Sequence, residues 1–177
     1  LYFRNNIKEF KFNKLKVEAG LNYVRKNKKL QCALTWKRRN SEFKDKTSLD
    51  LEDLKDILLM DEIEFINVQY TNEDDEIKKF EQENNFTLGK VSGLDPFNDL
   101  YNLAKFISKC DFVISISNTT AHLSAALGKP TYLILPKNRG KLWYWDNDFN
   151  NQNLWYPSIV KFIQKSNKDW GDPIFSF

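Results

Sequence analysis

From residue 30 onwards, the hydrophobic pattern of the chain alternates between short strand-like runs and helix-like spacing. Apolar runs rich in β-branched and aromatic residues predict strands at 29–36, 64–69, 112–116, 131–135 and 158–164. Helical spacing predicts helices at 49–60, 73–83, 97–109 and from about 118 to 127, and residues 87–91 could form one more short strand. This alternation predicts an α/β fold, a doubly wound, Rossmann-like parallel sheet of five or six strands with helices on both faces.

The residues ahead of the first predicted strand have a different pattern. Phe12, Leu15, Ala19 and Tyr23 recur at roughly helical spacing among many lysines, which predicts an amphipathic helix. The sequence therefore divides into a linker helix at 1–29 and one Rossmann-like domain at 30–177.

The segment from Cys110 to Pro136 carries the strongest local signal. Two apolar runs flank a helical pattern that starts in the polar cluster Ser117 to Thr120 and stops at Gly128, which is a βαβ unit with short connections. Parallel strands place ligands at their carboxyl ends, where the next helix offers free N–H groups and a positive dipole. We therefore expect an anion at residues 117–122.

Composition narrows the classes of protein. The chain has 177 residues, of which 41% are hydrophobic, enough for one folded domain with a real core. It lacks an apolar run long enough to span a membrane and a signal peptide, so the sequence predicts a cytoplasmic location. We expect the two cysteines to be reduced and structural.

Charge is distributed unevenly along the chain. Residues 1–48 carry a net charge of +10 and residues 49–100 a net charge of −11. These charges could be the solvated faces of neighbouring helices, or a basic rim that faces phosphate or an acidic partner.

The polar helix start has two interpretations. The Gly-x-Gly-x-x-Gly and Walker A patterns are absent, which argues against NAD binding and P-loop chemistry. Asn118, Thr119 and Thr120 could hold a diphosphate through N–H and hydroxyl donors, or only cap the helix. His122, in the first turn, could donate to a phosphate oxygen or a sugar hydroxyl, or be a packed histidine.

Further candidates follow the first two predicted strands on the same edge. Trp36, Lys37, Arg38 and Arg39 could neutralise a second phosphate or form an ordinary exposed basic loop. Gln69 and Tyr70 could hold a base or ribose, or close a turn.

A later loop combines basic and aromatic residues. Lys137 and Arg139, with the tryptophans that follow, could contact a sugar acceptor, a phosphate or single-stranded nucleic acid, although we expect its aromatic side chains to pack inward. Nucleic-acid binding ranks last, because the net charge is only +3. Residues 146–148 (Asp-Asn-Asp) lie in this loop rather than at a strand end, so the sequence predicts no metal site.

Several segments resemble one family in their order along the chain. They are ALTWKRR, EFINVQY, the long block FNDLYNLAKFISKCDFVISISNTTAHLSAALGKPTYLILP, and RGKLWYWDND, LWYPSIVKF and DWGD. Over about residues 30–172 the chain resembles the C-terminal, donor-binding half of GT-B glycosyltransferases. The similarity is to the heptosyltransferase-like family (glycosyltransferase family 9) and to bacterial tetratricopeptide-repeat glycosyltransferases.

The resemblance implies a metal-independent, inverting sugar transfer without a further cofactor. It implies that Asn118, Thr119, Thr120, His122 and Lys37 bind the diphosphate of a UDP-, GDP- or ADP-linked sugar, with Trp36, Gln69 and Tyr70 near the base and ribose. It also implies an N-terminal GT-B half as a partner, and the resemblance to the repeat-containing branch adds tetratricopeptide repeats. We expect the isolated chain to be inactive; the alternative is a non-catalytic, degenerate binding or scaffold module. The donor sugar and the acceptor stay open.

Overall fold

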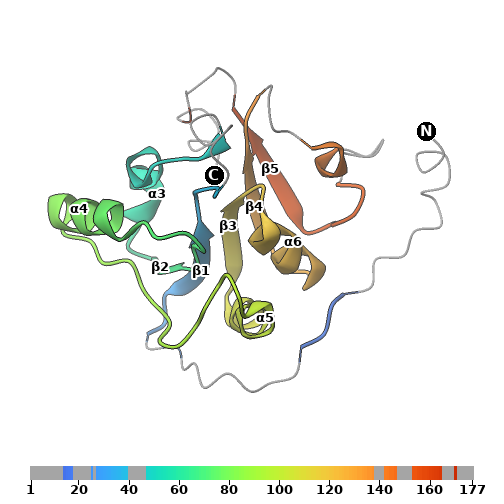
Figure 1. Ribbon diagram of the computed structural model, residues 1–177, viewed down its shortest axis with the longest axis horizontal. Helices are drawn as coiled ribbons and strands as arrows, with labels where there is room; N and C mark the ends of the chain where they lie inside the picture. The colour runs from blue at the N-terminus through green and yellow to red at the C-terminus, as the bar shows by residue number, and fades with distance from the viewer. Residues whose placement is uncertain are drawn as a thin grey trace.

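Five parallel strands form a single sheet in the computed structural model (Figure 1). The structure describes residues 14–17, 25, 27–39, 47–137, 142–146, 153–164 and 170. The strands are β1 (Leu30–Thr35), β2 (Ile63–Asn67), β3 (Phe112–Ile116), β4 (Thr131–Leu135) and β5 (Ile159–Ile163). Their order across the sheet is β2-β1-β3-β4-β5, and each neighbouring pair is parallel. The predicted α/β, Rossmann-like fold is confirmed, with five strands.

Helices fill the connections between the strands. They are η3 (Leu51–Leu54), a 3-10 turn that continues into α3 (Lys55–Leu58), then α4 (Asp74–Asn84), α5 (Leu100–Lys109), α6 (Thr119–Ala126) and the 3-10 turn η4 (Trp143–Trp145). Among the described residues no helix is long and apolar enough to cross a membrane.

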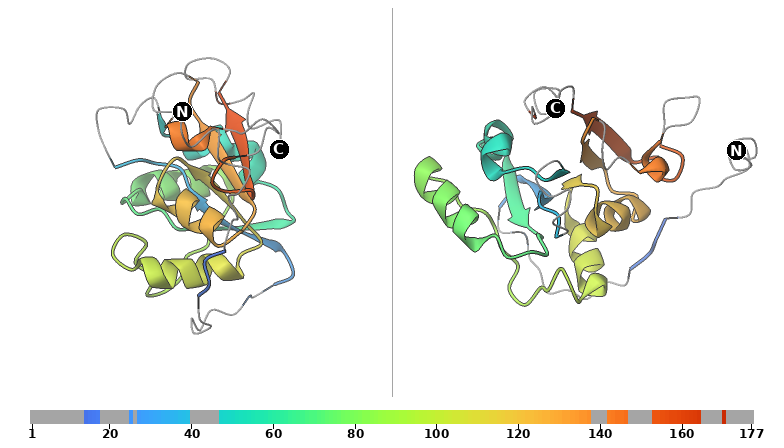
Figure 2. Two further views of the ribbon diagram at one scale, coloured as in Figure 1. Left: turned by 90° about the vertical axis from the view of Figure 1, so that its right-hand side faces the viewer. Right: turned by 45° about the horizontal axis from the view of Figure 1, so that its top comes forward.

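Helices cover both faces of the sheet, and the alternation of side chains along the strands decides which residues meet them. Cys32, Leu34 and Ile114 point to one face, where they pack with η3, α3 and α4. Ala33 and Val113 point to the other face and pack on α5. The views in Figures 1 and 2 show α3 and α4 on one side of the sheet and α5 and α6 on the other.

Both cysteines belong to this core. Cys32 and Cys110 are buried and unpaired by disulfides, as expected from the sequence. Burial raises the pKa of the Cys110 thiol to about 12, so the thiol stays protonated.

Some helix boundaries differ from the prediction. The expected helix at 49–60 is a 3-10 turn followed by one α-turn, and Asp50 rather than Ser48 caps it together with Asp53. Helix α5 begins one turn later than expected, because Asp95 accepts the N–H groups of Phe97 and Asn98 in a separate turn and Asp99 caps the helix. The candidate strand at 87–91 is reduced to one bridge between Ile66 and Gly89.

The expected linker helix is wrong where the structure describes it. Residues 14–17 are not helical: the Leu15 N–H donates to the carbonyl of Ala126, the last residue of α6, at 2.7 Å. Arg25 forms an ion pair with Asp111, at the start of β3. The rest of the predicted helix lies outside the described residues or, at 27–29, forms a bend.

Candidate functional site

The chain order of the strands creates a crevice between β1 and β3. After β1 the chain passes to η3 and α3 on one face, and after β3 it passes to α6 on the other. In a sheet of the order 2-1-3-4-5, this reversal point is where ligands bind, outside the carboxyl ends of the strands. A cleft of about 290 Å³ lies there, and its lining residues are Arg38, Arg39, Tyr70, Pro96, Phe97, Leu100, Ser117, Asn118, Thr119 and Thr120.

The start of α6 forms one wall of the cleft. Asn118 is its N-cap: the side-chain oxygen accepts the N–H of Ala121 at 3.2 Å and the hydroxyl of Ser115 at 3.0 Å, while the amide nitrogen donates to Thr35 Oγ1 at 2.8 Å. The Asn118 side chain therefore ties β1, β3 and α6 together. The N–H groups of Thr119 and Thr120 begin the helix, where no carbonyl of the helix itself can accept them, and they stay available to an anion.

Two arginines and two aromatic rings form the opposite wall. The guanidinium carbon of Arg39 lies 4.7 Å from the centre of the Phe97 ring, and its backbone N–H donates to the Tyr70 hydroxyl at 3.2 Å. Tyr70 and Phe97 lie near parallel with their centroids 6.4 Å apart. Within the described part of the chain, neither Arg38 nor Arg39 has a carboxylate partner. Their charges are therefore available to a ligand.

Lys37 lies next to these arginines but is engaged elsewhere. Its ammonium pairs with Asp50 and lies 3.3 Å from Glu76, and only 12% of its side chain is exposed. Burial alone would lower the pKa of Lys37, but the hydrogen bond to Asp50 and the charges of Glu76 and Asp50 outweigh it, and the pKa is raised. Lys37 does not line the cleft, so we leave it out of the phosphate site proposed below.

Gln69 and Trp36 also have structural partners instead of facing the cleft. The Gln69 side-chain oxygen accepts the N–H groups of Trp36 and Lys37 and the Thr35 hydroxyl, and its amide donates to the Lys37 carbonyl and to Thr71. It therefore fixes the turn after β1. Trp36 is fully buried in the core cluster of α3 and α4, with its indole N–H on Glu76. Only Tyr70, of the three predicted base and ribose contacts, reaches the cleft.

His122 is packed among aromatic side chains. Its ring stacks on Trp145 at a centroid distance of 4.4 Å, and Nδ1 lies 3.1 Å from the Tyr156 hydroxyl. Burial lowers the pKa of the imidazole. His122 is thus a packed histidine in the structure, and its donation to a phosphate oxygen or a sugar hydroxyl stays a prediction.

The aromatic loop folds inward at Trp145, as the sequence predicts. Trp145 is fully buried, and its indole N–H donates to Ser117 Oγ at 2.9 Å. This bond connects the loop to the floor of the cleft, because Ser117 is a lining residue.

The remaining candidates belong to the loop that follows β4. Lys137 is exposed and is not among the lining residues of the cleft. Arg139 and the last two residues of the Asp-Asn-Asp sequence at 146–148 lie outside the described residues. Among the described residues, no three His, Cys, Asp or Glu side chains cluster so that they could hold a metal ion.

Phe97 and Leu100 are cleft residues that the sequence analysis did not select. Both are large and apolar, but Phe97 precedes α5 and Leu100 is its first residue, and their exposed fractions are 48% and 45%. Helical spacing does not separate Leu100 from the buried Leu103 and Ile107, because it lies three and seven residues before them.

Fold and cleft together define a doubly wound, Rossmann-like α/β domain with a basic and aromatic crevice at its switch point. No family model matches the chain. The chain is 27% identical over 106 residues to Protein FlbA of Caulobacter vibrioides, which is 60% of this chain and 17% of FlbA. It resembles the structure of E. coli heptosyltransferase WaaC with ADP at a TM-score of 0.53 and 13% identity, over 87% of this chain and 42% of that chain. The chain thus spans less than half of either protein, and the likeness to WaaC shows a shared fold.

Proposed function

We propose that the chain is the donor-binding lobe of a metal-independent GT-B glycosyltransferase, which binds a nucleotide-sugar and serves transfer to an unknown acceptor. One observation carries this proposal: the cleft brings a helix N-terminus and an aromatic pair to the switch point of the sheet, together with two arginines that have no acidic partner among the described residues. The fold shared with a heptosyltransferase whose structure contains ADP adds support.

The diphosphate would lie against the N-terminus of α6. The N–H groups of Thr119 and Thr120 would donate to one phosphate, and Arg38 and Arg39 would donate to the other. As the bond between the sugar and the diphosphate breaks, negative charge grows on the leaving oxygen. The two guanidinium groups and the helix dipole would stabilise that charge.

The nucleoside would lie along the aromatic wall. Tyr70 and Phe97 present flat, partly exposed rings beside the arginines, and a base can stack on such a surface. The mixed lining of apolar and cationic groups suits a ligand with a flat ring at one end and a diphosphate at the other.

Catalysis would need a second lobe. In the family that the sequence resembles, the acceptor site and commonly the base belong to an N-terminal half, and one branch also carries tetratricopeptide repeats. We therefore propose that the isolated chain binds nucleotide with little or no turnover. Sugar transfer by the chain alone would contradict this part of the proposal and leave donor binding intact.

Calorimetric titration of ADP, UDP and GDP, with and without EDTA, tests the donor site. Each lost hydrogen bond to a charged group costs about 1.5–3 kcal/mol, so we expect Arg38→Gln/Arg39→Gln to weaken nucleotide binding by at least about tenfold. The matched control is Lys78→Gln/Lys79→Gln, which removes the same charge from exposed positions on α4. The proposal fails if no nucleotide binds, if EDTA abolishes binding, or if both double variants weaken it equally.

A further inference from the structure

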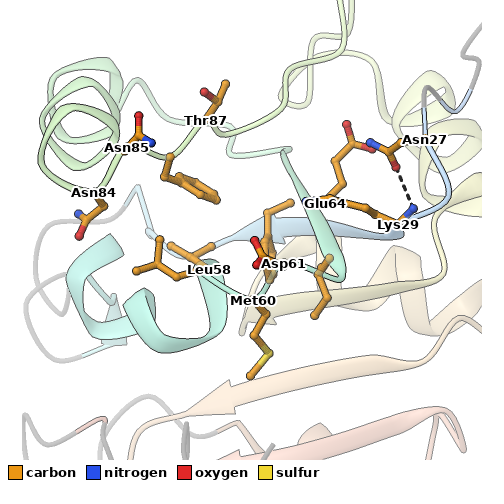
Figure 3. A pocket seen from close by; sticks show the side chains of 13 residues that line it. Asn27, Lys29, Leu58, Met60, Asp61, Glu64, Asn84, Asn85 and Thr87 are labelled. Atoms are coloured by element: carbon orange, nitrogen blue, oxygen red, sulfur yellow. Dashed lines mark hydrogen bonds between the residues drawn. The ribbon is translucent and has the colours of Figure 1, made fainter.

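A second cavity, of about 440 Å³, lies on the outer edge of β2 (Figure 3). It shares no lining residue with the cleft at the switch point. The close-up shows Asp61 between Leu58 and Glu64, with Asn84, Asn85 and Thr87 on one side and Asn27 and Lys29 on the other. Its walls therefore combine carboxylates, amides and an ammonium with the apolar side chains of Leu58 and Phe86.

The cavity begins where the single backbone bridge on the outer edge of β2 ends. Glu62 O accepts the N–H of Leu30 and the Val68 N–H donates to Leu34 O, so the even-numbered residues of this edge bond to β1 and the odd-numbered ones face outward. Gly89 meets the outward groups: its N–H donates to Phe65 O at 2.9 Å, and its carbonyl accepts the N–H of Asn67 at 2.8 Å.

Gly89 can do so because it has no Cβ. A Cβ at this position would lie 3.0 Å from Phe65 O and 3.1 Å from Ile66 Cγ1, closer than ordinary contact. Thr87, two residues before Gly89, does not continue this pairing with β2.

If the ladder continued, the N–H of Thr87 would donate to Ile63 O, and its carbonyl would accept the N–H of Phe65. Neither bond is among those of the described residues. Phe65 is only 1% exposed, so its N–H is a buried donor at the back of the cavity. A buried backbone N–H without an acceptor is costly, and water or a ligand normally satisfies it.

We propose that this cavity binds a free α-amino acid with an apolar side chain. A residue that continued the bridge at this position would present one N–H and one C=O on either side of a single Cα. A free amino acid presents an ammonium and a carboxylate in the same arrangement.

The walls of the cavity match the rest of such a ligand. The carboxylate would accept from the Phe65 N–H, and the ammonium would donate to Ile63 O and to Asp61, which precedes β2 on this edge. The side chain would pack on Leu58 and Phe86. A volume of about 440 Å³ lies within the ordinary range for small-ligand sites.

NMR titration of the ¹⁵N-labelled chain with L-leucine tests this site. We expect a saturable shift of the Phe65 amide resonance. We also expect at least tenfold weaker binding of 4-methylpentanoate, which lacks the ammonium, and of 3-methylbutylamine, which lacks the carboxylate. Asp61→Asn should weaken leucine binding at least tenfold, whereas Asp56→Asn, an exposed position on α3 outside the cavity, should leave it unchanged.

Three results would overturn the proposal. A Phe65 resonance that does not respond to leucine would mean that water alone fills the gap. Equal binding of leucine and its two analogues would mean that only the apolar wall is recognised. Equal weakening by Asp61→Asn and Asp56→Asn would mean that the carboxylate of Asp61 has no specific part.

Discussion

Substituting Lys37 by Met separates the two roles open to the first cation after β1. The family resemblance places a phosphate-binding cation at this position, whereas the structure pairs Lys37 with Asp50 and Glu76, away from the cleft. Met keeps the length of the apolar stem and removes the charge. We expect Lys37→Met to lower stability and to leave nucleotide affinity within about twofold.

The size of the stability loss follows from the partners of Lys37. Removing one member of a fully buried ion pair costs about 3–5 kcal/mol, because the other charge stays behind uncompensated. Here Asp50 is 72% exposed and can be solvated, and Glu76 is 23% exposed. Glu76 also keeps the N–H of Leu51 at 2.8 Å and the indole N–H of Trp36 at 3.2 Å. We therefore expect a loss of about 1–2 kcal/mol.

Urea unfolding measures the stability of the variant, and calorimetry with ADP measures its affinity. The control is Lys55→Met, which removes a lysine from an exposed pair with Glu52 and should change the free energy of unfolding by less than about 0.5 kcal/mol. If Lys37→Met instead weakened ADP binding tenfold at unchanged stability, Lys37 would be a ligand-binding residue and our assignment of the charges would be wrong.

Three further predictions concern the supports of the cleft. Gln69→Leu should cost about 2–4 kcal/mol in urea unfolding, because it removes the partner of two backbone N–H groups and one carbonyl in the turn after β1; Gln82→Leu, on an exposed position of α4, is the control. Trp145→Phe should cost about 1–3 kcal/mol and change the backbone amide resonance of Ser117, since the indole donates to that side chain; unchanged stability would show that the loop is not anchored there. The pKa of His122 is lowered by burial, so the stability that its neutral ring contributes is complete above the unfolded pKa near 6.5 and is lost as the pH falls toward the folded pKa. We therefore expect His122→Gln to flatten the dependence of the free energy of unfolding on pH between about pH 7 and 5. An equally steep dependence in this variant would exclude His122 as its cause.

The βαβ unit around α6 could be predicted to the residue in its strands. Strands β3 and β4 are short, apolar and β-branched, and a polar cap and a Gly limit the helix between them, so local signals agree. The segment after Ser48 was harder. Its leucines at 49, 51, 54 and 58 suit a helix, but the capping box at Asp50 and Asp53 starts a tight 3-10 turn, and only one α-turn follows.

The position of the candidate site could be predicted from the sequence, but not all of the residues that line it. The order of strands and helices predicts the edge of the sheet at which the site lies. The alternation of side chains along β1 is a signal that we overlooked: Trp36 continues the series Cys32, Leu34 and therefore points into the core. Whether a polar side chain forms a structural hydrogen bond or stays available to a ligand depends on its tertiary partners. Asp50, Glu76 and Gln69 come from three segments, and no local pattern reveals that they engage Lys37 or its backbone.

The division of labour among polar residues at the switch point explains how the cleft stays open and charged. The turn after β1 and the start of α6 diverge to opposite faces, so their backbone groups cannot satisfy one another. Gln69 and Asn118 replace those missing bonds, and each uses its side-chain oxygen as the acceptor for several donors. Asp50 and Glu76 pair with Lys37 rather than with Arg38 or Arg39, so the two arginine side chains can face the crevice unneutralised by these carboxylates. An uncharged, hydrogen-bonded frame with cations at its rim is an arrangement that favours a polyanionic ligand over a neutral one.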